Sequence, residues 1–293
     1  MRGGIGRRSL LLGALGLTGA VVFTNRDAMP AKALLGPCDV GIAPAGATAE
    51  PGPVTTGSFP SARRGRDVGY AIAYPPGARP GDRLPVCVVL HGLGADEHAA
   101  FDGIGYHRYL AGATAAGVPP FALAACAGGN AYWHRRSSGD DPLGMVLDEF
   151  LPLLSTLGLD VTRPALLGWS MGGFGVLQCA LARPGRFAAV VANAPAVWRS
   201  WDEVHRINPI AFDSAADWAA HDLVGRAAEF RGVPLRIDCG EADKFAAGVR
   251  ALRDHLPDPS IVHFAPGCHD NAFWHFAAPV QLRHIGHSLQ LGR

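Results

Sequence analysis

The stretch LLGWSMGGFG, residues 166–175, places one serine between two glycines in the pattern G-x-S-x-G. About 0.2 chance matches to this pattern are expected in a glycine-rich chain of this length, so the surroundings of the serine decide its meaning. The β-like run PALLGW precedes Ser170, and MGGFGVLQCALA, which has helical character, follows it. Strand, tight turn and helix are the context of a serine nucleophile. Glycine at 168 and 172 fits a strained turn that brings backbone segments close together.

A serine nucleophile needs a base to take its proton and an acid to orient that base. In this strand–turn–helix context the chain order is serine, then aspartate or glutamate, then histidine. Asp243 lies beyond Gly240 at the end of the apolar run PLRIDCGEAD, whereas the competing Asp238 lies inside that run. Because ligands bind beyond the carboxyl ends of parallel strands, Asp243 is the predicted acid.

The predicted base is His269, one of 12 histidines in the chain. It lies in APGCHDNAFW, directly after the last apolar run, where a further strand is expected to end. His275, His284 and His287 follow closely, but they fall in a predicted C-terminal helix. The loop that carries His269 is the one expected to face Ser170.

The oxyanion of an acyl-transfer intermediate needs backbone donors. The amide of Met171 lies at the predicted helix N-terminus, directed toward developing negative charge. The turn LHGLGAD, residues 90–96, supplies a second donor, for which we predict the amide of Leu93. His91 in the same turn is interpreted as a histidine that shapes the loop.

The elements that must position these groups follow from hydrophobic patterning. Continuous apolar runs that mostly enter glycine-rich turns predict strands at residues 84–92, 121–129, 163–170, 187–195, 234–243 and 259–267. Strands of this kind are buried on both faces and belong to parallel sheets. Helical spacing is present at residues 145–157, 172–183, 217–230 and 245–256, and residues 66–77 read as a half-buried edge strand. The alternation predicts an α/β fold, with a mostly parallel central sheet and helices on both faces.

Several segments together resemble a known group of enzymes. LPVCVVLHG, LDEFLPLL, the long stretch from LLGWSMGGFG to ANAPAVW, CGEADKF and PGCHDNAFW occur in family order over roughly residues 60–290. The chain thereby resembles the esterase branch of the α/β-hydrolase superfamily that includes the esterase D-like enzymes and the mycolyltransferases. The resemblance implies the α/β-hydrolase fold and a serine esterase that works through an acyl-enzyme. It assigns the nucleophile, acid and base positions to Ser170, Asp243 and His269, and the oxyanion positions to Leu93 and Met171.

Two other functions remain open at this stage. An acyltransferase of the mycolyltransferase type would use the same residues, although SMGG differs from the form associated with those enzymes. An exported binding protein could keep the fold and lose the chemistry, against which the complete set of three residues argues. No cofactor is expected, and no metal site, because no H-x-x-x-H pair or comparable ligand cluster is apparent.

The segment GGNAYWHRRSSGDDPLG, residues 128–144, is polar and follows the strand beside the oxyanion turn. Trp133, His134 and Arg135 are candidates to contact the substrate and to favour polar or carbohydrate-bearing esters. The alternative is a solvated loop. Residues 197–212 are a candidate cap over the site.

The N-terminus has the layout of an export signal. Arg7 and Arg8 precede an apolar run from Leu10 to Phe23, which resembles a twin-arginine signal, and AKA at residues 31–33 offers a cleavage site. The run is about 14 residues long, short of the roughly 20 that span a membrane, so no stable membrane span is expected after cleavage. We therefore predict a signal peptide at 1–33, an irregular leader at 34–60 and a catalytic domain at 61–293, in an exported, secreted or cell-envelope-associated protein.

The charge balance of the chain limits the kinds of partner that it is expected to bind. The 26 basic and 25 acidic residues nearly cancel, so nucleic acid is not an expected partner. The expected partner is a small-molecule or cell-envelope ester.

None of the 6 cysteines forms a C-x-x-C pair. Cys87, Cys126 and Cys179 read as core residues, and Cys239 can pair with Cys268.

Overall fold

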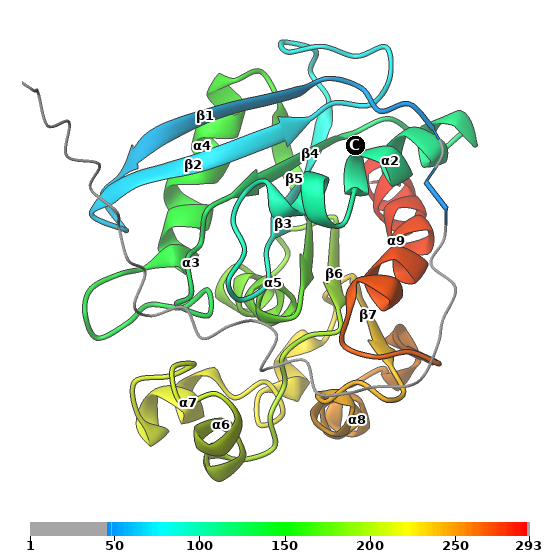
Figure 1. The fold of residues 1–293 in the computed structure, drawn as a ribbon. Coiled ribbons are helices and arrows are strands. Elements are labelled where there is room, and N and C mark those ends of the chain that lie inside the picture. The colour runs from blue at the N-terminus through cyan, green and yellow to red at the C-terminus, as the bar shows by residue number, and fades with distance from the viewer. Residues whose placement is uncertain (1–45, 48, 292–293) are drawn as a thin grey trace, which may run out of the picture.

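Eight strands form a single sheet in the computed structural model, which describes residues 46–47 and 49–291 (Figure 1). The strand order is β1-β2-β4-β3-β5-β6-β7-β8. Neighbours from β4 to β8 pair in parallel, whereas β1 with β2 and β2 with β4 are antiparallel. The strands are β1 (Val54–Ser61), β2 (Arg66–Ala73), β3 (Pro85–Leu90), β4 (Ala122–Cys126), β5 (Asp160–Trp169), β6 (Ala189–Asn193), β7 (Leu235–Gly240) and β8 (Val262–Ala265). The predicted α/β architecture and all six predicted parallel strands are confirmed.

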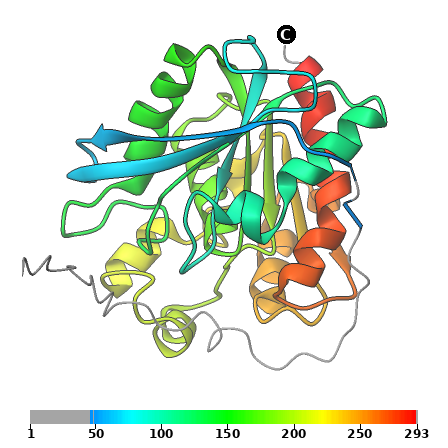
Figure 2. The ribbon, with the colours of Figure 1, turned by 45° about the horizontal axis from the view of Figure 1, so that its top comes forward.

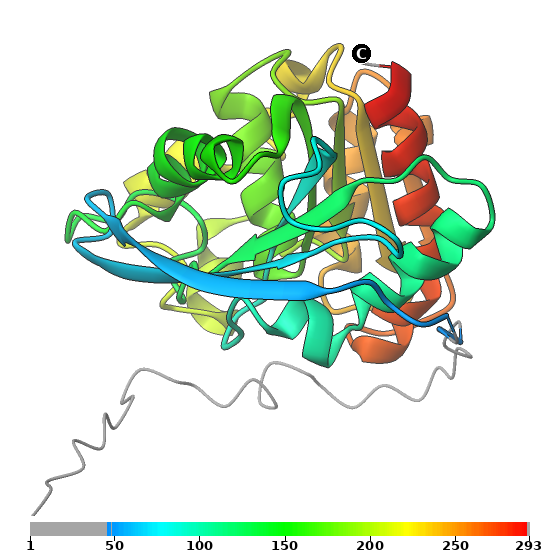
Figure 3. The same ribbon diagram turned by 90° about the horizontal axis from the view of Figure 1, so that it is seen from above.

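Helices cover both faces of the sheet, as predicted. Helices α2 (Tyr106–Ala115) and α9 (Asn271–Leu291) pack against each other on one face (Figures 1 and 3). The other face carries α4 (Leu151–Thr156), α5 (Met171–Ala182) and α8 (Ala246–His255), with the short turns α3 (Pro142–Gly144) and η2 (Met145–Phe150) leading into α4. The remaining elements are η1 (Ala99–Gly103), α6 (Trp201–Ile207), α7 (Ala215–His221), η3 (Ala227–Phe230) and η4 (Pro259–Ile261).

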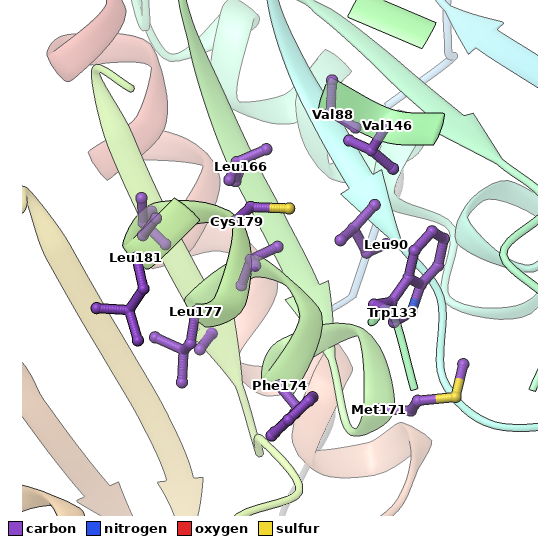
Figure 4. Close-up of a cluster of buried hydrophobic side chains, with 14 of the residues drawn as sticks. Val88, Leu90, Trp133, Val146, Leu166, Met171, Phe174, Leu177, Cys179 and Leu181 are labelled. Atoms are coloured by element: carbon purple, nitrogen blue, oxygen red, sulfur yellow. The ribbon is translucent and has the colours of Figure 1, made fainter. Parts of the chain in front are cut away.

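The two layers have separate hydrophobic cores because successive side chains of a strand point to opposite faces. In β3, Val88 and Leu90 enter the core under α5, whereas Cys87 and Val89 enter the core under α2 and α9. Figure 4 shows the first core, in which side chains of α5 pack on Leu166 of β5 and on β3. Nearly every residue of α5 is buried, as expected for a helix that is apolar on all sides. This packing anchors the turn that begins at Ser170.

The edge of the sheet differs from the prediction. Residues 54–60, expected to be irregular, form most of β1, and β2, expected at the edge, lies between β1 and β4. The side chains of β1 are largely exposed apart from Phe59 and Ser61, so the strand has no hydrophobic pattern to reveal it. Its Pro60 is tolerated because an edge strand has one unpaired side. Phe59 stacks on Phe150 of η2, which holds the β1–β2 hairpin to the helical layer. In Figure 2 the hairpin crosses the green helix of this layer.

The helix predicted over residues 217–230 is interrupted. Helix α7 begins after the cap Ser214 and ends at His221, and only the turn η3 follows. The carboxylate of Asp222 accepts hydrogen bonds from the amides of Val224 and Gly225, which replaces helical bonds with a turn. The other predicted helices correspond to η2 with α4, to α5 and to α8.

The predicted pairing of Cys239 with Cys268 is wrong. Cys239 is a free, buried thiol, whereas Cys268 is disulfide-bonded. The side chain of Cys239 points from β7 into the core under α5, and Cys87, Cys126 and Cys179 are also free and buried, as predicted.

The predicted signal peptide at 1–33 and the first part of the leader lie outside the described residues. Among the residues that are described, no helix is both long and apolar enough to cross a membrane.

Candidate active site

The carboxyl ends of three parallel strands bring the predicted acid, base and nucleophile into one line of hydrogen bonds. Ser170 directly follows β5, and Asp243 and His269 lie in the loops after β7 and β8. The Ser170 Oγ lies 2.8 Å from Nε2 of His269, whose Nδ1 lies 2.7 Å from Oδ2 of Asp243. A hydroxyl, an imidazole and a carboxylate in this order form the geometry of a serine-hydrolase triad.

The backbone at Ser170 is held in a conformation that L residues rarely adopt. Its φ is 56° and its ψ is −118°, which exposes the side chain at the start of α5. A Cβ on Gly168 would lie 2.2 Å from the carbonyl oxygen of Gly172, and one on Gly172 would lie 1.9 Å from the carbonyl oxygen of Leu90. The amide of Ser170 donates to Asn193 of β6. Both glycines are therefore required by close backbone packing that stabilises the strained turn.

Burial and aromatic contacts fix the orientation of the histidine and its acid. His269 is 7% exposed and Asp243 is 5% exposed. The second carboxylate oxygen of Asp243 accepts the amide of Phe245 at 2.7 Å. The rings of Phe245 and Trp274 approach the imidazole edge-on from 5.0 and 5.6 Å. The imidazole is thus held with one nitrogen toward Asp243 and the other toward Ser170.

Asp238, the alternative acid considered from the sequence, has different partners. Its carboxylate is paired with Arg236 at 2.6 Å and accepts a hydrogen bond from Gln281 of α9. It lies within β7, not beyond its end. The structure therefore brings Asp243, and not Asp238, to the histidine.

The two predicted oxyanion donors flank Ser170. Met171 is the first residue of α5, and Leu93 lies in the turn after β3. Within residues 49–291 neither amide has a hydrogen-bond acceptor. A Cβ on Gly92 would lie 2.8 Å from Nε1 of Trp169 and 3.5 Å from the Cβ of Ser170, which places the turn directly against the serine. Both donors are available to an oxygen bound there.

His91 shapes this turn, as the sequence indicated. It is 1% exposed, and burial lowers its pKa to about 4, so the ring is neutral. Nδ1 donates to the carbonyl of Gly92 at 2.7 Å, and Nε2 accepts the amide of Gly128 at 2.9 Å. The ring therefore joins the turn after β3 to the loop after β4 and has no free nitrogen for proton transfer.

Ser170 and His269 open on a cavity of about 270 Å³. Its wall is mostly apolar and includes Leu93, Ile104, Tyr132, Trp169, Phe245 and Trp274. Among the residues that the structure describes, the buried indole Nε1 of Trp274 has no hydrogen-bond partner. Lys244 also lines the cavity, and burial lowers its pKa to about 8. Among the described residues no carboxylate forms an ion pair with its ammonium group. The cavity thus has a mostly apolar wall with one cationic residue, Lys244, in it.

The three residues predicted to contact substrate lie elsewhere. Trp133 is 1% exposed, packs on Gly128 and Gly175, and donates its indole proton to the carbonyl of His91. His134 is fully buried and bonds the carbonyl of Ala211 at 3.0 Å, and Arg135 is exposed. None of the three lines the cavity. Positive φ values of 53° at both Tyr132 and Trp133 turn the chain sharply, so the neighbouring Tyr132 contributes to the wall instead.

Sequence reasoning therefore missed Tyr132, Lys244, Phe245, Asn271 and Trp274 as cavity residues. Most of them lie one to five positions after a predicted triad residue. Proximity to Asp243 and His269 was the available signal, whereas the turn at Tyr132 has no sequence signature.

A known protein family matches most of this chain. Residues 61–274 match the model of the family described as "Putative esterase". The chain belongs to this family. The match begins at the last residue of β1 and ends within α9, so it includes every residue of the proposed triad.

Curated relatives align with a shorter part of this chain than the family model does. The S-formylglutathione hydrolases of Mus musculus and Rattus norvegicus are each 32% identical over 115 residues, which is 37% of this chain and 40% of the relative. The chain thus matches less than half the length of these relatives.

Solved structures superpose on a larger share of this chain. A ferulic acid esterase superposes with a TM-score of 0.68 at 19% identity, covering 80% of this chain and 98% of that one. An S-formylglutathione hydrolase from Agrobacterium tumefaciens gives a TM-score of 0.67 at 19% identity, covering 83% and 97%. These neighbours share the α/β-hydrolase fold.

Proposed function

We propose that the protein is a serine esterase that hydrolyses carboxylic esters through Ser170, His269 and Asp243. The observation that carries the proposal is the line of hydrogen bonds from Ser170 Oγ through His269 to Asp243, at 2.8 and 2.7 Å. Membership of the esterase family supports it independently.

In the first step, Oγ of Ser170 bonds to the ester carbonyl carbon while Nε2 of His269 takes the hydroxyl proton. The carbonyl π electrons move to its oxygen, which accepts hydrogen bonds from the amides of Leu93 and Met171. Asp243 stabilises the imidazolium through the proton on Nδ1. When the carbonyl re-forms, the alcohol leaves with the proton from Nε2, and an acyl-enzyme remains.

In the second step, water attacks the acyl-enzyme and gives its proton to Nε2. The acid then leaves Ser170 Oγ, which recovers the proton, so the residues return to their starting states. An alcohol in place of water would complete acyl transfer instead. The relatives named above are described as hydrolases and esterases, so hydrolysis is the function proposed.

The cavity suggests the kind of substrate. Trp169, Phe245 and Trp274 line it and would contact an apolar, aromatic or aliphatic group near the carbonyl. The ammonium group of Lys244 would attract a negatively charged group of the substrate. We therefore propose esters with an apolar body and an anionic group. The names of the ferulic acid esterase and S-formylglutathione hydrolase relatives give two compounds with which to test this proposal.

The experiment is active-site labelling followed by a substrate panel. A fluorophosphonate should label the wild-type chain at Ser170 and leave Ser170→Ala unlabelled. Assays would then compare short and long acyl esters, methyl ferulate and S-formylglutathione, each with and without an acceptor alcohol. Labelling that persists in Ser170→Ala contradicts the assignment of the nucleophile, and labelling without turnover of any ester contradicts the esterase.

Export is a separate proposal that rests on residues 1–33, with Arg7, Arg8 and the apolar run after them. Expressed in a bacterium with a twin-arginine pathway, the full chain should be exported, and the variant with Arg7→Lys and Arg8→Lys should stay inside. Export of both proteins to the same extent would contradict the twin-arginine route. Retention of both would contradict export itself.

A further inference from the structure

Two histidines and an aspartate meet behind the wall of the catalytic cavity. His134 comes from the loop after β4, and Asp217 and His221 lie one turn apart on α7. One ligand atom from each residue lies within 4.8 Å of the others. His134 is fully buried, whereas Asp217 and His221 are partly exposed. None of the three belongs to the triad or lines its cavity.

The spacing fits a tetrahedral metal ion. Nitrogen and oxygen ligands bind Zn²⁺ at about 2.0–2.2 Å, so two ligand atoms on one ion are separated by about 3.3–3.5 Å. Nδ1 of His134 already lies 3.6 Å from Oδ1 of Asp217. The rings of His134 and His221 have their centroids 4.4 Å apart. Binding an ion would require shifts of the Asp217 and His221 side chains, both of which are partly exposed.

Hydrogen bonds to the other ring atoms leave ligand positions free. Each ring nitrogen of His134 lies within hydrogen-bond distance of a carbonyl oxygen, Nε2 at 3.0 Å from that of Ala211 and Nδ1 at 3.1 Å from that of Arg135. A neutral imidazole carries one ring proton, so with this proton on Nε2 the lone pair of Nδ1 can bind an ion. Nδ1 is also the atom that lies 3.6 Å from Oδ1 of Asp217. In His221, Nδ1 lies 2.8 Å from the carbonyl oxygen of Asp217 and 3.2 Å from its Oδ1. A neutral ring keeps a lone pair on one of its two nitrogens, and that nitrogen is the ligand.

Bonds from imidazole protons to backbone carbonyls are the usual support of metal-binding histidines. The charge of the neighbouring Arg136 is already paired with Asp213 at 2.6 Å, so the Asp217 carboxylate keeps its negative charge available. Two imidazoles and one carboxylate suit Zn²⁺ and related transition ions more than Ca²⁺ or Mg²⁺, which prefer oxygen ligands.

We propose that His134, Asp217 and His221 form a binding site for one transition-metal ion of the zinc type, with a fourth position left to water. The ion would fasten α7 to the loop after β4. That loop contains Tyr132, which lines the catalytic cavity and bonds Asn208 through its hydroxyl. Occupancy of the site therefore stabilises α7 and this part of the cavity wall without touching the reacting atoms.

The test uses the full chain, freed of metal with a chelator and dialysed. Titration with Co²⁺ should produce the visible absorption of a four-coordinate ion, saturating at one ion per chain, and Zn²⁺ should abolish it. Zn²⁺ at about 100 times its Kd should raise the Tm by about 5 °C or more. Asp217→Asn and His221→Gln should lose both effects.

The matched control is His205→Gln, which removes an exposed histidine from α6 of the same region and should leave both effects intact. The Tm of each metal-free variant, compared with that of the metal-free wild type, separates loss of the site from loss of the fold. A Tm shift that persists in Asp217→Asn, or a Co²⁺ spectrum without the four-coordinate band, overturns the proposal. These readouts do not depend on ester hydrolysis, so they remain valid if the proposed esterase function fails.

Discussion

Two clusters of histidine and aspartate in this molecule use the same side chains in different ways. In the first, His269 lies between Asp243 and Ser170 with hydrogen bonds at 2.7 and 2.8 Å. In the second, the Nδ1 atoms of His134 and His221 lie 3.6 and 3.2 Å from Oδ1 of Asp217. The third member sets the chemistry, because a hydroxyl completes a proton relay and a second imidazole completes a ligand set.

The clusters also differ in what positions them. Loops at the ends of neighbouring parallel strands hold Asp243 and His269. His134 and α7 belong to segments outside the sheet, joined by polar contacts such as that of Arg136 with Asp213. The strands of the sheet therefore hold the first cluster rigidly, whereas the geometry of the second depends on contacts between two surface segments.

The largest expected effect separates the two clusters by activity. Ser170→Ala should lower the kcat for ester hydrolysis by about 10⁴-fold or more, because the nucleophile is removed. His221→Gln should leave kcat within about threefold, since its ring does not line the cavity. Steady-state kinetics on one ester, with circular dichroism to verify folding, measures both. Comparable losses in the two variants would remove the distinction.

The two aspartates offer a closer comparison. Asp243→Asn should lower kcat by about 10³–10⁴-fold, because the amide no longer holds the histidine tautomer that accepts the serine proton. Asp217→Asn should change kcat little and abolish the metal-dependent Tm shift. The two isosteric variants are measured by the same assay and the same melting experiment. A large loss of kcat in metal-free Asp217→Asn would show that the second cluster contributes to catalysis.

Two glycines test the difference in rigidity. A Cβ on Gly172 would meet the backbone oxygen of Leu90 at 1.9 Å, whereas one on Gly225 would meet the side-chain carboxylate of Asp222 at 2.7 Å, which can shift more easily than backbone. Gly172→Ala should therefore lower the free energy of unfolding by about 3 kcal/mol or more, or prevent folding. Gly225→Ala should change it by less than about 1 kcal/mol. Denaturant unfolding monitored by tryptophan fluorescence gives both values, and equal effects would contradict the expected contrast.

The smallest expected effect concerns Lys244 beside the triad. Its pKa is lowered to about 8 by burial, so the ammonium group is charged at pH 7 and mostly neutral at pH 9. The kcat/KM for an anionic ester, relative to that for a neutral ester of the same size, should fall about 3–10-fold between these pH values. Taking the ratio removes every pH effect that is common to the two substrates. In Lys244→Met the ratio should be low and independent of pH, and a pH dependence that persists there would exclude Lys244 as the cause.

Much of the catalytic framework could be predicted from local patterns. Continuous apolar runs identified the strands that are buried on both faces, and the rule that ligands bind at their carboxyl ends pointed to Asp243 and His269. The structure brings both residues together with Ser170. Edge strand β1 escaped this reasoning because its mostly exposed side chains have no apolar pattern.

What the sequence by itself determined was the parallel sheet, the glycine-flanked turn at Ser170 and the order of the groups around it, since each depends on short-range periodicity and the connectivity of strands. Only the tertiary structure decided that Tyr132 and not Trp133 lines the cavity, because two successive positive φ values turn the loop. It also decided that His134 meets Asp217 and His221. Contacts between segments so far apart in the chain arise from packing of the whole molecule, which no local pattern encodes.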